Sequence, residues 1–359
     1  MNKITIIGAG KTGRGFLARL ACEQNATIQF IDKDASLVRA LKDVGSFKVT
    51  FFGNQREAVT ISGFTADTWD TADFSDAELI LVSVGGTNLK DVGSQLRKHL
   101  DPDKHYYIIT AENSSNPSGV LREAIGLDNI SVSEATVFCT TIETDVLHIA
   151  SENYPYLQCN ADLLEGYIPA ISSIKPIPQF GNFLTRKLFT YNAASCVIAY
   201  LGFLKGFTDY GEAANNPEIL ALLDQNYAVT NRVLCKEFGY EEADQKEFAL
   251  LSRNKFCDRT IIDTVARNAR EPQRKLGHNE RVIGPLLLQH QYSEEASVLE
   301  QTVAAMLLYD HESEIEWRKI KAENTPEEIL ECICGLDKSS TAFRNIMNYY
   351  YRFKQDLFS

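Results

Sequence analysis

The spacing of hydrophobic positions changes near the middle of this chain. In the first half, short apolar runs such as residues 3–7 and 79–84 are typical of buried strands, and helical patterns alternate with them. In the second half, long amphipathic stretches follow one another with few strand signals between them. The change predicts an α/β domain with a parallel-core sheet over residues 1–180, followed by a mostly α-helical domain over residues 181–359.

Finer patterns within each half predict individual elements. Residues 47–52 and 58–61 flank Gly53-Asn54 and predict a β-hairpin inserted into the α/β pattern. From residue 130 to 180 only short strands and loops are expected, because four prolines interrupt the chain. Helices of the second domain are expected at residues 182–204, 217–238, 243–254, 258–269, 280–290, 294–310 and 326–334.

A glycine pattern directly follows the first strand and precedes a helix. Gly8 permits a tight turn, Gly10 lets the backbone approach a pyrophosphate, and Gly13 allows close helix packing. The free N–H groups at the start of the helix suit phosphate oxygens. The first domain is therefore predicted to be a Rossmann-type dinucleotide-binding domain, with phosphate contacts from Gly8, Ala9, Gly10, Lys11, Thr12 and Gly13.

Asp32 ends the second strand, about 20 residues past the glycines, where a carboxylate accepts hydrogen bonds from ribose hydroxyls. The same charge repels a 2′-phosphate, which favours NAD over NADP, although Lys33 beside it opposes this preference. The alternative is that Asp32 only ends a strand. Val84 at the end of one later strand, and Glu112 and Asn113 after another, are further candidates for cofactor contacts; for Glu112 and Asn113 the alternative is a cap or a turn.

Composition narrows the class of protein. The 359 residues carry a net charge of −12, which disfavours nucleic acid and anionic membrane surfaces as partners. No apolar run has the length of a signal peptide or a membrane span, so we expect a cytoplasmic protein. A monomer or a homodimer is expected. Eight scattered cysteines are expected to be reduced thiols, and the pair Cys332 and Cys334 lacks the further ligands that a zinc site needs. No metal is predicted.

Polar residues recur on the first helix of the second domain, in the stretch Arg186-Lys187-Leu188-Phe189-Thr190-Tyr191-Asn192-Ala193-Ala194-Ser195. On an α-helix Lys187 and Asn192 lie roughly 140° apart with Ser195 between them, so the three can border one cleft. This stretch, the glycine pattern with Arg14-Gly15-Phe16, and Arg267 to Leu276 with Arg281 and Pro285 resemble the mannitol-1-phosphate 5-dehydrogenases and the wider polyol-specific long-chain dehydrogenase family.

The resemblance implies roles for these side chains. Lys187 would be the general acid/base and Asn192 would hold the reacting oxygen; without the resemblance, Lys187 would be taken for a solvated surface lysine. Ser195 stands where the family has a histidine, and Val137-Phe138-Cys139 departs from the family's Val-Asp-Arg stretch. A hydroxyl can hydrogen-bond a substrate oxygen but cannot carry a positive charge. The substrate is therefore expected to differ, or activity to be changed or lost.

A basic stretch in an acidic protein completes the candidate site. Its cations suit a sugar phosphate, and the alternative is a network of ion pairs. His278 within it either replaces the missing imidazole or lies in a surface loop. The predicted substrate-binding residues are Arg267, Arg270, Arg274, Lys275, His278 and Arg281. The expected function is NAD-dependent hydride transfer to or from a polyol, a ketose or their phosphates; the alternatives are an unphosphorylated polyol or sugar acid as substrate, or a dinucleotide-binding relative without activity.

Overall fold

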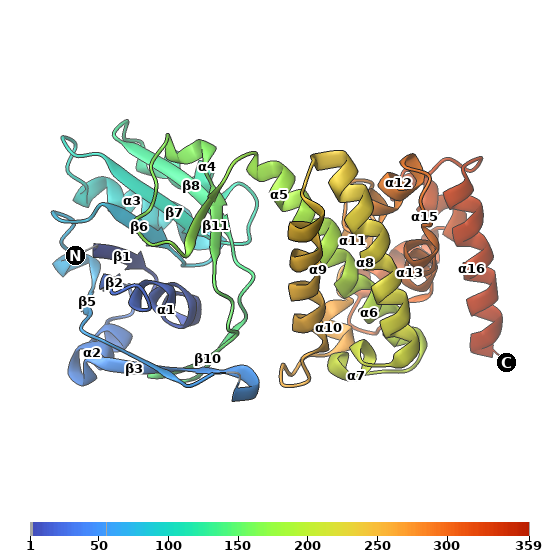
Figure 1. Cartoon of the computed structure of the whole chain (residues 1–359), viewed down its shortest axis with the longest axis horizontal. Coiled ribbons are helices and arrows are strands. Elements are labelled where there is room, and N and C mark those ends of the chain that lie inside the picture. The colour runs from blue at the N-terminus through green and yellow to red at the C-terminus, as the bar shows by residue number, and fades with distance from the viewer. Residues whose placement is uncertain (1–2, 55, 359) are drawn as a thin grey trace. The chain divides into compact units, whose positions relative to one another are not determined.

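The computed structural model describes residues 3–54 and 56–358. The chain divides into two compact units, an amino-terminal unit (Met1–Phe183) and a carboxy-terminal unit (Leu184–Ser359). The sequence placed this boundary at residue 180. The division falls inside the helix α5 (Phe180–Lys187), whose last turn begins the helical unit (Figure 1).

The amino-terminal unit is built on an eight-stranded sheet. Its strand order is β12-β11-β8-β7-β6-β1-β2-β5, and neighbouring strands are parallel except β8 and β11. The strands are β1 (Lys3–Ile7), β2 (Thr27–Ile31), β5 (Thr65–Asp67), β6 (Leu79–Val82), β7 (Tyr106–Ala111), β8 (Ile130–Thr136), β11 (Leu157–Asn160) and β12 (Ile174–Ile177). The predicted α/β fold with a parallel core is confirmed.

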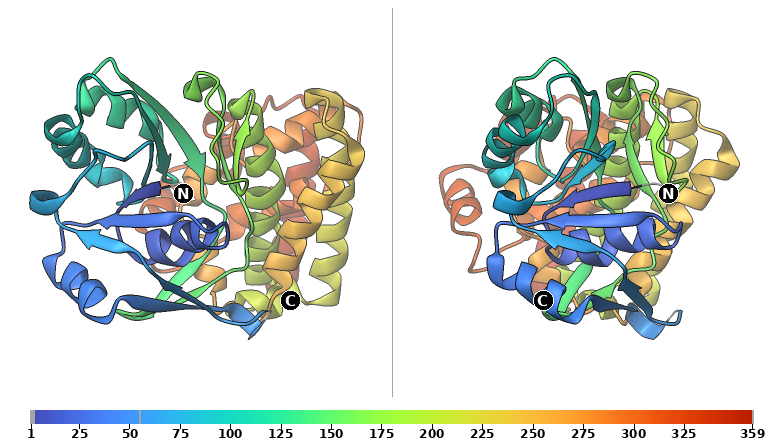
Figure 2. Two further views of the ribbon diagram at one scale, coloured as in Figure 1. Left: turned by 60° about the vertical axis from the view of Figure 1, so that its left-hand side comes forward. Right: turned by 90° about the vertical axis from the view of Figure 1, so that its left-hand side faces the viewer.

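The strands of this sheet are apolar because both of its faces are covered. All four residues of β6 are buried, and separate hydrophobic clusters contain Ile6 and Ile7, which are neighbours on β1 and therefore point to opposite faces. The connecting helices are η1 (Gly13–Ala18) with α1 (Arg19–Cys22), α2 (Ala35–Val44), α3 (Leu89–His99) and α4 (Pro117–Ile125) (Figures 1 and 2). Strand order reverses direction at β1, between β2 and β6, and such switch points bind ligands at the carboxyl ends of the strands.

A second sheet of four strands has the order β4-β3-β10-β9. The predicted hairpin is confirmed as the antiparallel pair β3 (Ser46–Phe51) and β4 (Val59–Ser62), with Gly53 at φ +63° in its turn. The strands β9 (Thr141–Asp145) and β10 (His148–Ser151) extend this hairpin, and β10 pairs with β3 in parallel. β10 packs directly on η1, because a Cβ atom on Gly15 would lie 2.4 Å from Cγ2 of Ile149.

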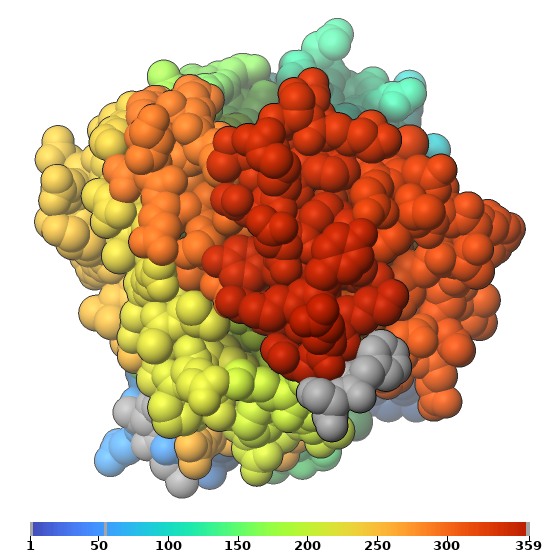
Figure 3. All heavy atoms as spheres, turned by 90° about the vertical axis from the view of Figure 1, so that its right-hand side faces the viewer, coloured from blue at the N-terminus to red at the C-terminus, as the bar shows by residue number. Residues whose placement is uncertain are grey.

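The carboxy-terminal unit is helical, as predicted, and surrounds the helix α6 (Ala193–Leu204), nine of whose twelve residues are buried. The other helices are η6 (Leu188–Asn192), α7 (Tyr210–Ala214), α8 (Pro217–Phe238), α9 (Glu242–Cys257), α10 (Val265–Asn268), α11 (Pro272–Lys275), α12 (Ile283–Gln291), α13 (Ser297–Leu308), α14 (Ile315–Glu323), α15 (Pro326–Cys332) and α16 (Thr341–Phe358). Figure 3 shows α16, in red, lying across one face of this unit beside segments coloured orange and yellow.

Two parts of the helical prediction need correction. The helix expected at residues 258–269 is replaced by a turn and the four-residue α10, because Asp258 Oδ1 accepts hydrogen bonds from the backbone N–H and the hydroxyl of Thr260. Thr264 then begins α10 by accepting the backbone N–H of Arg267 at 3.1 Å. The helices α7, α11, α14 and α16 were not predicted.

The continuous helical run Phe180–Leu204 is the one described helix whose length and composition would allow it to cross a membrane. It has 25 residues and a mean hydropathy of 1.2 in its most apolar window, and 67% of that window is buried inside the protein. Its apolar side chains from Ala194 to Leu201 belong to the core of the helical unit.

Candidate functional site

The glycines after β1 form a turn that only glycine fits at two positions. Gly8 has φ +97°, and a Cβ atom there would lie 2.1 Å from the backbone oxygen of Ser83. A Cβ atom on Gly13 would lie 1.9 Å from the oxygen of Gly8. Gly10 differs, because a Cβ atom there would meet nothing within 4 Å. The space in front of Gly10 is therefore open to a group that approaches the backbone, as a phosphate does.

Asp32 lies against this turn. Its Oδ2 accepts the N–H of Ala9 at 2.7 Å, and its Oδ1 accepts the N–H of Asp34 at 2.9 Å. A carboxylate has about four acceptor positions, so both oxygens can still accept ribose hydroxyls. The neighbouring Lys33 is exposed and donates to the side chain of Asn88 at 3.2 Å.

The residues that follow β6, β7 and β8 are tied to one another. Oε1 of Glu112 accepts the N–H groups of Val84 and Gly85, both at 2.7 Å, and partial burial raises the pKa of this carboxyl group while the two bonds oppose the rise. Asn113 exchanges two hydrogen bonds with the backbone of Val137, each 3.1 Å long. Neither residue caps α4, whose N-cap is Asn116. The structure thus places them as links between strand ends.

The other predicted cofactor residues border the same turn. Lys11 is exposed, and the hydroxyl of Thr12 lies 3.5 Å from that of Thr141. A side-chain methyl group of Val84 would lie 3.0 Å from a Cβ atom on Gly8. The amino-terminal unit therefore brings all ten predicted cofactor residues to the carboxyl ends of β1, β2, β6 and β7 or to the segments that follow them.

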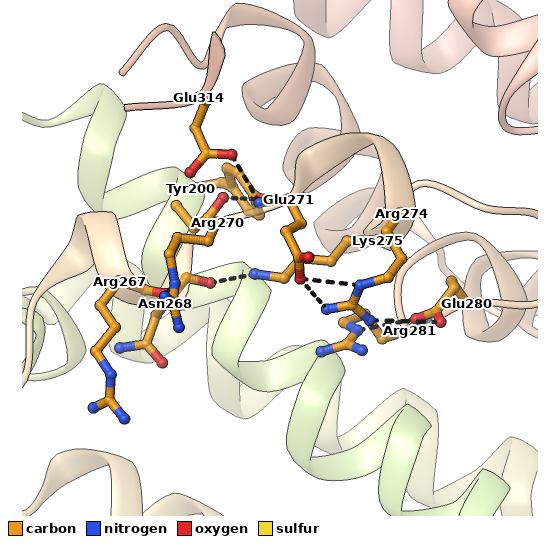
Figure 4. A network of polar contacts seen from close by, with 11 residues as sticks. Tyr200, Arg267, Asn268, Arg270, Glu271, Arg274, Lys275, Glu280, Arg281 and Glu314 are labelled. Atoms are coloured by element: carbon orange, nitrogen blue, oxygen red, sulfur yellow. Dashed lines mark hydrogen bonds and ion pairs between the residues drawn. The ribbon is translucent and has the colours of Figure 1, made fainter. Parts of the chain in front are cut away.

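The carboxy-terminal unit has a pocket of about 190 Å³. All five predicted cations of the basic stretch line it, together with two polar residues of the first helical run. The lining residues are Asn192, Ser195, Cys196, Arg267, Asn268, Arg270, Glu271, Arg274, Lys275 and Arg281. Figure 4 shows the basic side chains and their polar contacts.

Three of these cations have carboxylate partners. Arg267 pairs with Asp263 at 3.0 Å; the other pairs are Arg274 with Glu271 at 2.8 Å and Arg281 with Glu280 at 3.1 Å. At these three positions the structure therefore has the ion pairs that the sequence offered as the alternative to phosphate binding.

Lys275 and Arg270 differ from the other three, since neither has an ion pair within residues 3–54 and 56–358. Lys275 is only 6% exposed, and its Nζ donates to the backbone oxygen of Asn268 at 2.6 Å (Figure 4). Burial lowers its pKa most, and the charges of Arg281 and Arg274 lower it further, whereas Cys196 and Glu271 oppose the shift. A buried ammonium group without an ion pair in the wall of a pocket that is mostly cationic favours an anionic ligand.

Ser195 and Asn192 both line this pocket, but only Ser195 has hydrogen bonds from its side chain. The hydroxyl of Tyr210 donates to Ser195 Oγ at 3.2 Å, and Ser195 donates to Asn268 Oδ1 at 3.4 Å. Asn268 is oriented by its own Nδ2, which donates to the oxygen of Thr264 at 3.0 Å. Ser195 therefore presents an acceptor lone pair to the pocket, whereas the amide of Asn192 has no hydrogen bond to any residue that the structure describes.

Lys187 is partly buried at the end of α5 and does not belong to the pocket lining. Desolvation lowers its pKa to about 8, and the charges of Lys255 and Arg281 add to the effect. The solvated surface lysine considered as an alternative is thus not what the structure has. A lysine with such a pKa exchanges a proton near neutral pH, which general acid/base chemistry requires.

His278 does not line the pocket that contains Ser195. It is exposed, and its Nδ1 lies 3.0 Å from the backbone oxygen of Cys334, outside the pocket lining. The surface-loop alternative describes this residue. All eight cysteines are free thiols, and burial raises the pKa of Cys334 to about 12.

Comparison with known proteins identifies the helical part of the chain. Residues 179–338 match the mannitol dehydrogenase C-terminal domain. A mannitol-1-phosphate 5-dehydrogenase of Anoxybacillus flavithermus is 26% identical over 337 residues, which cover 86% of this chain and 88% of the relative. The enzyme of the same name from Geobacillus thermodenitrificans is 24% identical over 97% of this chain and 98% of its own. Residues 179–338 thus form a mannitol dehydrogenase C-terminal domain, and the chain is similar to mannitol-1-phosphate 5-dehydrogenases over most of its length.

Two solved structures share the fold of the whole chain. A D-sorbitol dehydrogenase in substrate-free form has a TM-score of 0.77 at 12% identity, covering 98% of this chain and 93% of that one. The Pseudomonas fluorescens mannitol 2-dehydrogenase, solved as a ternary complex with NAD and D-mannitol, has a TM-score of 0.62 at 13% identity, covering 100% and 92%. Residues 4–160 also match the ketopantoate reductase PanE/ApbA domain. At 12% and 13% identity, the two solved structures show the fold alone.

Sequence reasoning missed four residues of this pocket or its border. Asn268 and Glu271 stand inside the stretch that carried the resemblance, so their neighbours could have pointed to them. Cys196 follows Ser195 on α6 and lines the pocket. Tyr210 gave no local signal, because it reaches Ser195 from a different helix, α7.

Proposed function

We propose that this chain is an NAD(H)-dependent oxidoreductase that interconverts a secondary alcohol of a polyol phosphate and the corresponding ketose phosphate. Three features support the cofactor: the open backbone at Gly10, the carboxylate of Asp32 beside the turn, and the NAD complex of the Pseudomonas fluorescens enzyme of the same fold. When bound, the nicotinamide supplies or accepts the hydride. The amino-terminal unit holds the cofactor, and the carboxy-terminal unit holds the substrate.

NAD is preferred to NADP because Asp32 is a fixed negative charge next to the phosphate-binding turn. Lys33 is the cation that opposed this preference in the sequence. Its ammonium group donates to Asn88 rather than standing beside Asp32 without a partner. The preference for NAD therefore rests on the carboxylate of Asp32.

The single observation that carries the substrate class is Lys275. This buried ammonium group lines the pocket without an ion pair among the described residues, and the exposed Arg270 lines it without an ion pair as well. An anionic group of the substrate supplies the missing charge, and a guanidinium group adds paired N–H donors for phosphate oxygens. The curated relatives, named mannitol-1-phosphate 5-dehydrogenases, make a hexitol phosphate the first candidate.

Lys187 is the proposed general acid/base. In alcohol oxidation its neutral amine accepts the hydroxyl proton, and in ketone reduction its ammonium group donates a proton to the carbonyl oxygen. Asn192 holds the reacting oxygen with its amide donors, since this amide has no other partner among the described residues. Ser195 accepts a hydrogen bond from a substrate hydroxyl. The amine manages the proton in this scheme, so no metal is assigned.

A second candidate substrate is a sugar acid, because a carboxylate would complement Lys275 and Arg270 as a phosphate does. The two are separated by measuring kcat/KM for fructose 6-phosphate, fructose and tagaturonate with wild type and Lys275→Met. The proposal expects Lys275→Met to lower kcat/KM for fructose 6-phosphate by about tenfold or more and to leave fructose within about twofold. Turnover of tagaturonate alone would show that the anionic group of the substrate is a carboxylate and not a phosphate. An equal loss of kcat/KM with all three ketoses in Lys275→Met would show that Lys275 does not recognise the anion.

A further inference from the structure

Arg14 is a fully buried arginine directly beneath the glycine turn. Its side chain is 0% exposed, and its Nε donates to the backbone oxygen of Ala9 at 2.5 Å. One terminal nitrogen donates to the oxygen of Val146, and the other pairs with the carboxylate of Glu143 at 2.9 Å. Glu143 belongs to β9, and Val146 lies in the turn that follows this strand. A single guanidinium group therefore connects the turn to the second sheet.

Burying this charge is unfavourable by itself. Desolvation lowers the pKa of Arg14, and the charges of Glu143, Asp32 and Asp145 oppose that effect. A guanidinium group keeps its proton in proteins, so the buried charge persists and needs every partner that surrounds it. Such an arrangement is costly to maintain for packing alone, which a neutral side chain would serve.

The bond to Ala9 also fixes the direction of the next peptide group. A trans peptide is planar, and its C=O and N–H point in opposite directions. Because the Ala9 oxygen points inward to Arg14, the N–H of Gly10 points away from Arg14. This N–H has no acceptor among residues 3–54 and 56–358, and a Cβ atom on Gly10 would meet nothing within 4 Å. The donor is thus available to a ligand oxygen, such as that of a phosphate, that approaches the open backbone at Gly10.

We propose that Arg14 is a positioning residue for the pyrophosphate of the dinucleotide, and that the β9–β10 hairpin with Glu143 is its support. The inference rests on the cofactor assigned in the proposed function. Arg14 turns the Gly10 N–H toward the phosphate and places a positive charge behind it, without touching the ligand. The second sheet is then part of the cofactor site, and the close contact of Gly15 with Ile149 holds it against the first helix.

Arg19 provides a matched control in the same unit. It is also 0% exposed, donates to the backbone oxygen of Tyr154 and pairs with Glu23 at 3.3 Å. It makes no hydrogen bond to the glycine turn. Lysine at either position keeps the charge but loses the planar set of donors, so Arg14→Lys and Arg19→Lys are expected to lose similar stability while only the first disturbs the Gly10 peptide.

The test measures dissociation constants for NADH directly, and for ADP-ribose and adenosine by competition with NADH. Arg14→Lys should weaken ADP-ribose by about tenfold or more and adenosine by less than about twofold, because only ADP-ribose has the pyrophosphate. Arg19→Lys should change neither by more than about twofold. Equal weakening of both ligands by Arg14→Lys, or no weakening of either, would overturn the positioning role.

Glu143→Gln decides the question if Arg14→Lys does not fold. The Glu143 side chain is 40% exposed, so the variant removes the supporting charge with little change in packing. We expect it to weaken ADP-ribose about threefold or more, again without an effect on adenosine; an unchanged ratio of the two constants contradicts the proposal. If wild type itself binds neither NADH nor ADP-ribose, the cofactor assignment is wrong. That result differs from one in which wild type binds both ligands and the Arg14 variant binds them equally well, which refutes only the positioning role.

Discussion

Replacing Lys255 with methionine removes a positive charge that lowers the pKa of Lys187. That pKa is about 8, against an ordinary value of 10.5. The difference means that the protein makes deprotonation of Lys187 easier by about 3 kcal/mol than it is for a lysine in water. Desolvation is the largest cause, and Lys255 comes next. Loss of one nearby like charge should raise the pKa of Lys187 by about half a unit to one unit. Lys246→Met, on the same helix but exposed and paired with Glu242, is the matched control.

The assay is the pH profile of kcat/KM in both directions. Alcohol oxidation needs the neutral amine, so its rate should rise with pH and level off above about 8. Ketone reduction needs the ammonium form, and its rate should fall through the same pH. In Lys255→Met both limbs of the profile should move to higher pH, and in Lys246→Met they should stay where they are. Lys187→Ala should show no limb near pH 8, and its kcat should be lower by about 10²-fold or more. Near-normal turnover by Lys187→Ala, or profiles without a limb near pH 8, would refute the role of Lys187.

Four further outcomes are expected. Lys187→Met should stabilise the fold most below pH 8 and lose this advantage as pH rises toward 10.5, since the folded protein binds fewer protons than the unfolded chain in that window; thermal unfolding at several pH values checks it. Asp32→Ala should weaken NADH more than NADPH, and an unchanged affinity ratio on titration would remove Asp32 from the ribose site. His278→Ala should leave turnover of fructose 6-phosphate within about twofold, whereas a large loss would revive its part in catalysis. Ser195→His should change the preference between fructose 6-phosphate and fructose by about tenfold, and equal kcat/KM ratios in wild type and variant would show that this position tolerates either residue.

The part of the fold predicted from sequence was the part with local signals. The β1 strand, the glycine turn and the following helix occupy adjacent residues, so a β-branched run, three glycines and a helical pattern were sufficient. The pairing of β10 with β3 joins His148 to Lys48, which are 100 residues apart, and no local pattern specifies such a partner. Correspondingly, Arg14 gave no signal of its role, because its partners Glu143 and Val146 come from that distant hairpin.

The candidate site shows the same limit. The basic stretch was predicted from its charge, and the structure brings its five cations into one pocket. Charge alone could not reveal that Lys275 is buried without an ion pair among the described residues, while Arg267 is 63% exposed and paired with Asp263. Nor could it place His278, whose ring meets the backbone of Cys334 in a loop 56 residues further on. Burial and partners of single side chains depend on short helices such as α10 and α11, whose packing the sequence does not display.

The most direct test of the account is consumption of NADH by purified protein with fructose 6-phosphate, fructose and tagaturonate, next to a direct measurement of NADH binding. The account predicts binding of NADH in preference to NADPH and rapid oxidation of NADH with fructose 6-phosphate, with fructose a much weaker substrate. Binding of NADH without turnover of any of the three ketoses would contradict the proposed activity, and turnover of fructose as fast as fructose 6-phosphate would contradict the anionic substrate assigned to Lys275 and Arg270.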